Sequence, residues 1–100
     1  MDIQQRIIWK SFKELFPDET IYETALVLCY EFGDVAKSLF YLKKRGLRKA
    51  YIIETKKALG DLIAQIKIIC SFLQLDYEEV ENFGTMTILE HFNRIRKGKE

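Results

Sequence analysis

Apolar residues recur at steps of three and four along almost the entire chain, and this spacing restricts the possible folds more than any other feature. Ile8, Phe12 and Leu15 belong to the first part of the pattern, and longer segments continue it. Such steps return a side chain to the same face of an α-helix. The 100 residues contain one proline and five glycines, which argues against β-sandwiches and disordered linkers. We therefore predict one all-α domain over residues 1–100, an antiparallel helical bundle of four to five helices.

The first helix is expected from Met1 to Phe16, because Pro17 disfavours helical geometry in the residue before it. Gln5 and Trp9 lie off the centre of its apolar stripe. We interpret Trp9 as packing against another helix or subunit, with stacking on a nucleobase as the alternative. The expected stripe consists of Ile3, Ile7, Ile8, Phe12 and Leu15.

Two long helices joined by a tight turn are predicted next. Thr20 opens the first of them, and Glu23 completes a capping box. Gly46 suits the left-handed position just past its end. The second helix is expected from about Arg48 to Leu73. Because only the short turn joins the two helices, we expect them to pack antiparallel. The predicted stripes are Ile21, Ala25, Leu28, Phe32, Val35, Leu39 and Leu42 in the first helix, and Leu59, Leu62, Ile66, Ile69 and Leu73 in the second.

The last quarter of the chain predicts two shorter helices. Asp76 begins a brief helix, and Gly84 is expected to interrupt it. Thr87 with Glu90 then indicates a fresh cap before a final amphipathic helix. We expect the first and last helices to flank the antiparallel pair.

Composition and charge restrict the partners. The net charge of +1 creates no overall field that favours nucleic acid or an anionic membrane, so we expect neither. The N-terminal residues lack the pattern of a signal peptide, and we expect a cytoplasmic protein. Cys29 and Cys70 are expected to be buried free thiols, with a disulfide as the alternative. A hydrophobic content of 48% is high for so small a core, which favours a homo-dimer or homo-tetramer.

Three acidic residues are expected to meet on one edge of the helix pair. Glu31 and Asp34 are three residues apart and are therefore neighbours on a helix surface. Asp61 occupies the corresponding edge of the next helix, and edges of the same sense meet when two helices pack antiparallel. At about 1.5 Å per residue, Asp34 and Asp61 both lie roughly 20 Å from the turn. The alternative is a set of surface ion pairs with Lys37 or Lys57.

These acids lie within two recognisable motifs. Residues 31–37, EFGDVAK, resemble the E-x-G-E/D-x-A-K stretch of the MazG-like nucleotide pyrophosphohydrolases. Residues 59–65, LGDLIAQ, resemble the E-L-G-D segment of the next helix in that family. The family pairs ExxE on one helix with ExxD on the following helix, and the similarity covers roughly Thr20 to Arg96.

The resemblance implies an all-α enzyme that uses Mg²⁺ or Mn²⁺ to cleave nucleoside triphosphates into the monophosphate and pyrophosphate. By position, Glu31, Asp34 and Asp61 would be the catalytic metal ligands. Ala58 stands where the second motif has its first acid, and Glu54, one turn earlier on the same face, is the candidate substitute. The candidate substrate-binding residues are cationic or aromatic: Lys37, Lys57, Trp9, Arg94 and Arg96.

Three functions remain open at this point. The chain is an enzyme of this kind, a module that binds nucleotides without turnover, or an oligomeric interaction module whose acids only interact with solvent. The missing acid at Ala58 would weaken metal binding or abolish activity. Arg94 and Arg96 have a second interpretation, because cations are favoured near a helix C-terminus. No base-reading motif is recognisable, so the sequence does not identify the base.

Overall fold

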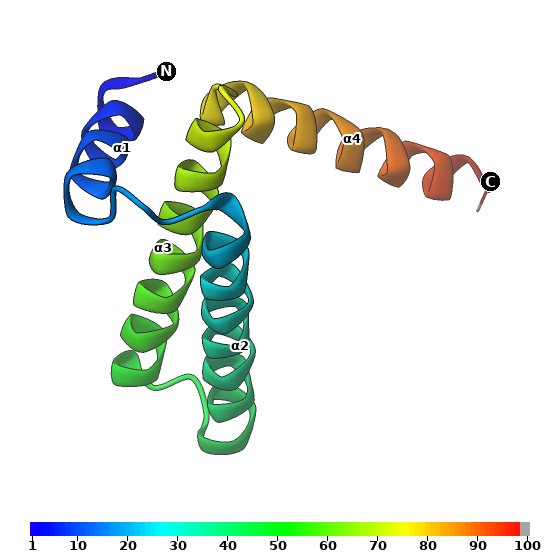
Figure 1. Cartoon of the computed structure of the whole chain (residues 1–100). Helices are drawn as coiled ribbons and strands as arrows, with labels where there is room; N and C mark the ends of the chain where they lie inside the picture. The colour runs from blue at the N-terminus through cyan, green and yellow to red at the C-terminus, as the bar shows by residue number, and fades with distance from the viewer. Residues whose placement is uncertain (99–100) are drawn as a thin grey trace.

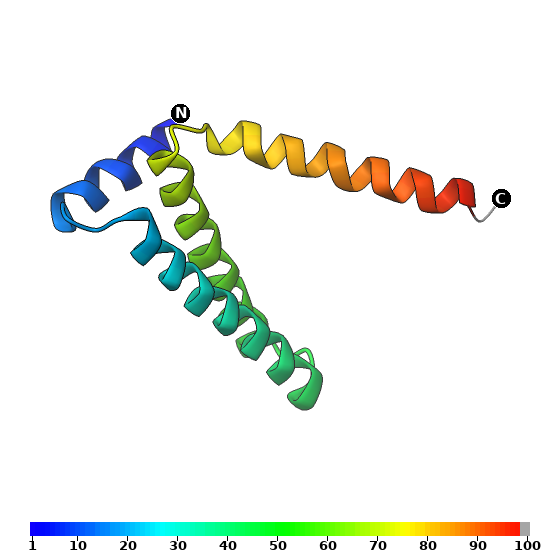
Figure 2. The same cartoon turned by 45° about the vertical axis from the view of Figure 1, so that its right-hand side comes forward.

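The structure is a computed structural model that describes residues 1–98, and this part of the chain is all-α with four helices. The long helices α2 and α3 form an antiparallel hairpin, α1 packs near the C-terminal end of α3, and α4 projects away from the other three (Figure 1 and Figure 2). The predicted all-α bundle is confirmed. The helices are α1 (Ile3–Leu15), α2 (Ile21–Arg45), α3 (Lys49–Phe72) and α4 (Tyr77–Gly98).

Local capping interactions set the ends of α1 and α2 close to the predicted positions. The Asp2 side chain accepts a hydrogen bond from the Gln5 amide at 2.7 Å and begins α1. At the start of α2, the Thr20 hydroxyl accepts one from the Glu23 amide at 3.4 Å. Gly46 ends α2 with a φ of +90°, in the region that glycine adopts without steric strain.

Several of the residues that are most buried in the two hairpin helices have small side chains. Thr24 and Val35 of α2 are buried, and so are Thr55 and Ala58 of α3. Small side chains allow two helices to approach closely. The predicted stripe of α2 is therefore only partly right: Val35 is buried, and Ile21, Leu28 and Leu42 are half-buried, but the rest of the stripe is exposed. Phe32 and Leu39 are 64% and 53% exposed.

Helix α1 is also rotated relative to its predicted stripe. Phe12 is buried, and Trp9 packs edge-on against Phe72 of α3 with ring centroids 4.9 Å apart. The interpretation of Trp9 as packing against another helix is confirmed. Edge-to-face contacts of this kind favour aromatic pairs beyond the area that they bury. Three residues of the predicted stripe are exposed instead: Ile3, Ile7 and Leu15.

Gln5 connects three helices through one fully buried side chain. Its Nε2 donates to Ser71 Oγ at 3.2 Å and to the Leu75 carbonyl at 2.9 Å. Its Oε1 accepts a hydrogen bond from the Tyr77 amide at 2.9 Å. The exposed fraction of Gln5 is 0%, so these bonds take the place of all its contacts with water. Gln5 therefore joins α1 to the end of α3 and to the start of α4.

The last helix is one continuous element, so the predicted break at Gly84 is wrong. An isolated glycine within a helix costs only about 1 kcal/mol relative to alanine, which neighbouring residues can offset. Thr87, predicted to cap a new helix, instead donates its hydroxyl hydrogen to the Phe83 carbonyl at 2.8 Å. Threonine commonly makes this bond to the preceding turn within a helix.

Helix α4 also does not flank the hairpin as expected. None of the residues Tyr77–Gly98 is buried, and the helix extends into solvent (Figure 1). The radius of gyration of 16.7 Å exceeds the value of about 13 Å typical of a compact chain of this length. Within residues 1–98, no single helix is long and apolar enough to span a membrane. Only α3 and α4 taken together meet that criterion, and they are bent by 112°.

Both cysteines are free thiols. This agrees with the prediction, but only Cys70 is buried. Cys29 is exposed on α2, so its predicted burial is wrong for the same reason as that of Phe32: the face of α2 in contact with α3 is rotated away from both.

The buried amide of Gln5 gives a stability prediction. Gln5→Leu keeps a similar volume but leaves the Tyr77 amide and the Leu75 carbonyl without their partner. An unsatisfied buried polar group costs about 1–3 kcal/mol, so we expect a loss of about 2 kcal/mol in the free energy of unfolding, measured by urea denaturation. The neighbouring Gln4→Leu is the control, because Gln4 is exposed. Equal losses in the two variants would contradict the assigned role of Gln5.

Candidate functional site

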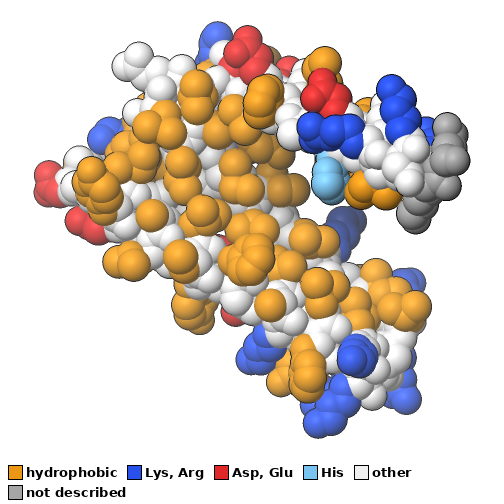
Figure 3. Space-filling view, turned by 90° about the vertical axis from the view of Figure 1, so that its right-hand side faces the viewer, with side chains coloured by type: hydrophobic (Ala, Val, Ile, Leu, Met, Phe, Trp, Pro, Cys, Tyr) orange, Lys and Arg blue, Asp and Glu red, His pale blue; other side chains and the backbone are white. Residues whose placement is uncertain are grey.

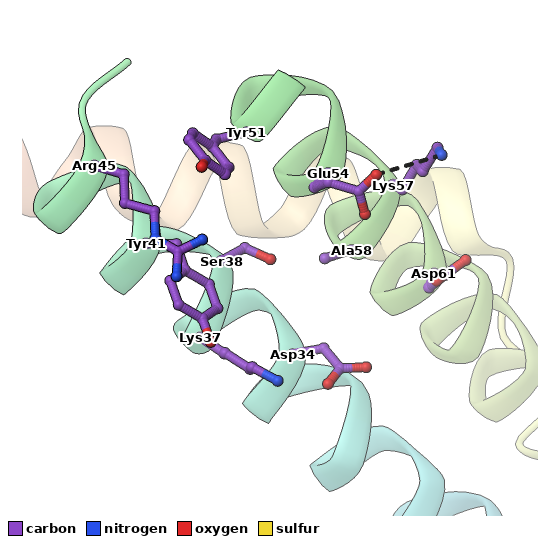
Figure 4. Close-up of a pocket in the computed structure, with 10 residues that line it drawn as sticks. All are labelled: Asp34, Lys37, Ser38, Tyr41, Arg45, Tyr51, Glu54, Lys57, Ala58 and Asp61. Atoms are coloured by element: carbon purple, nitrogen blue, oxygen red, sulfur yellow. Dashed lines mark ion pairs between the residues drawn. The ribbon is translucent and has the colours of Figure 1, made fainter. Parts of the chain in front are cut away.

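A polar groove runs along one edge of the hairpin, between α2 and α3 (Figure 4). Its walls come from positions that repeat every three or four residues on each helix, because such positions share a face. The groove therefore follows directly from the antiparallel pairing of the two helices. The residues that line it are Asp34, Lys37, Ser38, Tyr41 and Arg45 of α2, and Tyr51, Glu54, Lys57, Ala58 and Asp61 of α3.

Two of the three predicted acids line the groove from opposite helices. Asp34 lies on the α2 side and Asp61 on the α3 side, near the end of the groove away from the turn (Figure 4). Glu31 lies one turn before Asp34 and does not line the groove, but it is half-buried beside it. Burial raises the pKa of Glu31, and the negative charges of Asp61 and then Asp34 raise it further. Glu31 therefore lies close enough to Asp61 and Asp34 for their charges to disfavour its own.

Glu54, the candidate substitute ligand, is paired with a cation of its own helix. Its Oε1 lies 3.6 Å from Nζ of Lys57, and both side chains are exposed. Ion pairs of this kind on a helix surface add little stability, so this contact does not commit Glu54 to one position. Glu54 thus remains available to the groove, closer to the turn than Asp61.

Ala58 lies at the bottom of the groove. It is 8% exposed and forms part of the α2–α3 contact. The position that carries an acid in the resembling family therefore faces both the groove and the neighbouring helix. A longer side chain at position 58 has to extend along the groove, because the contact between α2 and α3 has little space for it.

Aromatic and cationic side chains line the end of the groove nearest the turn. The Arg45 guanidinium lies over the rings of Tyr41, at 4.6 Å, and Tyr51, at 5.7 Å. Nζ of Lys37 lies 5.9 Å from the centre of the Tyr41 ring. Such contacts show that cations of the groove lie over the faces of both rings.

Sequence reasoning predicted Lys37 but missed Tyr41, Arg45 and Tyr51, although part of the signal was present. Lys37, Tyr41 and Arg45 are spaced four residues apart, which places them on one face of α2. Tyr51 and Ser38 lie on the walls only because of how α2 and α3 pair.

The five predicted substrate-binding residues divide into two groups. Lys37 and Lys57 both line the groove, one from each helix. Trp9 packs against Phe72 in the α1–α3 contact, and Arg94 and Arg96 lie on the projecting helix α4. These three are not part of the groove wall in a single chain.

The groove offers oxygen donors of the kind that Mg²⁺ prefers. Within residues 1–98, no group of three or more His, Cys, Asp and Glu side chains is arranged to hold a metal ion. Magnesium is usually held by one or two carboxylates together with waters and substrate phosphates, rather than by a complete protein cage. Asp34 and Asp61 fit that shared mode of binding, with Glu31 beside them.

Comparisons with known proteins identify no relative. No protein-family model matches the chain, and no curated protein or solved structure is significantly similar to it. The resemblance to the MazG-like family rests on the motif residues in 31–37 and 59–65.

The raised pKa of Glu31 predicts a specific effect of pH on stability. The folded state holds the Glu31 proton more tightly than the unfolded state, whose carboxyl has a pKa near the ordinary 4.5. Stability is therefore lost as pH rises from about that value through the folded pKa, and the loss persists at neutral pH. Glu31→Gln removes this charge, so we expect it to unfold at a higher temperature than wild type at pH 7 in the presence of a chelator.

The same comparison at low pH supplies the internal check. Below the unfolded pKa both proteins carry an uncharged group at position 31, so the difference in midpoint should disappear. Glu14 is an exposed residue of α1. Glu14→Gln changes the net charge by the same amount, so it controls for the effect of net charge on stability. A Glu31→Gln midpoint no higher than that of wild type at pH 7 would contradict the crowding of the three carboxylates.

Proposed function

We propose that this chain is a Mg²⁺- or Mn²⁺-dependent nucleoside triphosphate pyrophosphohydrolase that acts in the α2–α3 groove. Its reaction would be the hydrolysis of an NTP or dNTP, with one water, to the nucleoside monophosphate and pyrophosphate. The observation that carries the proposal is the composition of the groove. Acids from both helices lie at one end, lysines lie along both walls, and two tyrosine rings lie at the other end.

This combination matches the chemistry of a nucleotide and its metal. A triphosphate needs cations along its length, and lysine is a common point-charge ligand for phosphate. Lys37 and Lys57 meet that need from opposite walls. Tyr41 and Tyr51 present ring faces on which a planar base can stack. A divalent ion, when bound, neutralises phosphate charge and lowers the pKa of a coordinated water.

The three acids would have distinct tasks in this proposal. Asp34 and Asp61 supply carboxylate oxygens from opposite walls and so set the position of the bound phosphates relative to both helices. Glu31, whose pKa is raised, holds a proton more readily than an isolated glutamate does. It is therefore suited to accept a proton from an attacking water.

A nucleotide-binding protein without turnover is the second candidate, and Ala58 is the observation that favours it. The second motif has one acid fewer than the family pattern, and fewer charged ligands reduce the affinity for a metal ion. The same residues would then hold a nucleotide and metal without positioning a water for attack. Turnover and metal binding have to be measured separately to distinguish the two functions.

The first test is release of pyrophosphate from a panel of NTPs and dNTPs with Mg²⁺ or Mn²⁺. We expect Asp34→Asn to reduce the rate at least about tenfold, because even partners of metal ligands contribute about 10–100-fold. Asp18→Asn is the matched control, since Asp18 is an exposed carboxylate in the connection between α1 and α2.

Thermal melts of the same proteins separate the two candidate functions. A ligand that binds only the folded state raises the melting temperature. A metal-dependent rise that Asp34→Asn abolishes, without any pyrophosphate release, would assign the groove to binding alone. No release and no metal-dependent rise in the wild type would rule out both functions.

Ala58 provides a gain-of-function prediction. Ala58→Glu adds a carboxylate that can extend along the groove towards Asp61, so we expect faster pyrophosphate release at low Mg²⁺. Ala58→Gln has nearly the same shape without the charge and should show no gain. Asp61→Asn in the Ala58→Glu background should remove the gain. Equal rates for Ala58→Glu and Ala58→Gln would mean that position 58 does not contribute to metal binding.

A further inference from the structure

Positive charge is concentrated at the end of the hairpin that carries the turn. The whole chain contains 16 Lys and Arg against 15 Asp and Glu. Residues 35–53 hold six of these cations and none of the acids, so the rest of the chain has ten cations against 15 acids. The net charge of +1, from which we expected no attraction to an anionic membrane, therefore combines a strongly basic region with an acidic remainder.

Four of the six cations lie in the last turn of α2, the connection and the first residue of α3. We call Lys43, Lys44, Arg48 and Lys49 the basic turn, and all four residues are exposed. Within residues 1–98 none of them forms an ion pair. Figure 3 shows Lys and Arg side chains gathered at this lower end of the molecule. Helices α1 and α4 lie at the opposite end of the hairpin (Figure 1), so the basic turn is open to a partner.

Helix stability accounts for only half of the basic turn. Lys43 and Lys44 lie in the last turn of α2, where the helix dipole favours cations. Arg48 and Lys49 are the N-cap and the first residue of α3, where the dipole disfavours them. The Arg48 side chain makes no capping bond, and the first turn of α3 contains no acid. Residues that oppose local stability in this way are expected at functional sites.

An apolar residue occupies the centre of the basic turn. The Arg48 amide donates a hydrogen bond to the Gly46 carbonyl at 2.9 Å, and such a bond closes a tight turn around the residue between them. That residue is Leu47, which is 78% exposed. The turn therefore presents a leucine to solvent with two cations on each side of it along the chain.

The arrangement of the cations favours contact with a flat surface. Lys43 and Lys44 are consecutive, so their side chains leave α2 in directions about 100° apart. At the start of α3 the Cα–Cβ bonds tilt towards the N-terminus of the helix and hence towards the turn. The cations therefore lie on both sides of Leu47 and do not form a row along one helix face, the arrangement typical of nucleic-acid binding. A plane across the end of the hairpin can meet all four cations and Leu47 together.

We propose that the basic turn docks this protein on the surface of a membrane that contains anionic phospholipids. The four cations lie at the level of the anionic headgroups, and Leu47 enters the boundary between headgroups and acyl chains. Clusters of about four to eight Lys and Arg bind such surfaces, and each cation raises the partition coefficient about fivefold. None of these five residues lines the groove, so the inference does not depend on the proposed enzymatic activity.

Flotation of the full chain with lipid vesicles is the first test. We expect binding to vesicles of phosphatidylcholine mixed with phosphatidylserine, and none to phosphatidylcholine alone. Raising the salt from about 0.1 M to about 1 M shortens the screening length from about 10 Å to about 3 Å, so binding should fall steeply. Absence of binding to the mixed vesicles, or equal binding to the two kinds of vesicle, overturns the proposal.

Paired variants test where the contact lies. The double variant Lys43→Gln, Lys44→Gln removes two cations of the basic turn and should lower the partition coefficient about 25-fold. The matched control is Arg94→Gln, Arg96→Gln, which removes two exposed cations from α4 and should leave binding nearly unchanged. Equal losses in the two double variants would assign the attraction to α4 or to net charge, and would overturn the proposal.

Leu47 tests the apolar part of the contact. Leu47→Ser should lower the partition coefficient about tenfold at every salt concentration, because salt does not screen the burial of an apolar side chain. In Leu47→Trp, tryptophan emission should shift to shorter wavelengths when the mixed vesicles are added. The wild type, whose one tryptophan packs against Phe72, should show no such shift. An unshifted Leu47→Trp would overturn the insertion of this residue.

A nucleic acid is the competing partner for a basic surface. Titrations with a fluorescent single-stranded RNA and with duplex DNA, in the buffer used for flotation, distinguish it from lipid. We expect no measurable binding, because the cations do not form a row along which an extended backbone can lie. Nucleic-acid binding that the Lys43→Gln, Lys44→Gln variant loses, in a protein that does not float with the mixed vesicles, would assign the basic turn to nucleic acid and overturn the proposal.

Discussion

The close contact between α2 and α3 along a line of small side chains is the constraint on which the rest of the structure depends. Thr24 and Val35 of α2 and Thr55 and Ala58 of α3 are buried at different heights along this contact, and larger residues at these positions would separate the helices. Because the contact is narrow, two long edges of the hairpin remain open. One edge is polar and forms the groove, and the other is apolar. The same few residues therefore decide where the groove lies.

The groove illustrates how charges of both signs can share a small volume. Asp34 and Asp61 face each other from different helices, and their repulsion acts on the half-buried Glu31. Lysines on both walls and the Arg45 guanidinium against two tyrosine rings balance this charge locally. A bound divalent ion would relieve the repulsion among the acids, and the polyphosphate that shares this ion would pair with the lysines. This balance is the physical basis of the proposed function.

Gln5 has a comparable influence at the opposite end of the molecule. A polar side chain that is fully buried requires partners for both its donor and its acceptor atoms, and it finds them on the end of α3, the connection and the first residue of α4. The direction of α4 is thus set by hydrogen bonding rather than by apolar packing. Because the helix is directed away from its own hairpin, the exposed apolar area of the chain remains large.

The sequence by itself determined the features that depend on neighbouring residues. Caps at Thr20 and Gly46 and the three- and four-residue apolar steps act locally, so they set the number of long helices and most of their ends. The placement of Asp34 and Asp61 on one edge of the hairpin was also predictable. It needs only the helical repeat and an antiparallel turn.

Only the tertiary structure decided which face of each helix is buried and what the hairpin leaves open. Apolar periodicity identifies a face but does not distinguish one that packs within the chain from one that is exposed, which is why Phe32 was predicted to be buried and Thr24 was not. Gln5 was missed because a glutamine becomes a core residue only when acceptors and donors from distant segments surround it. Gly84 carries a small helical penalty that its neighbours offset. Tyr51 reaches the groove because α3 packs beside α2, and no local pattern contains that information.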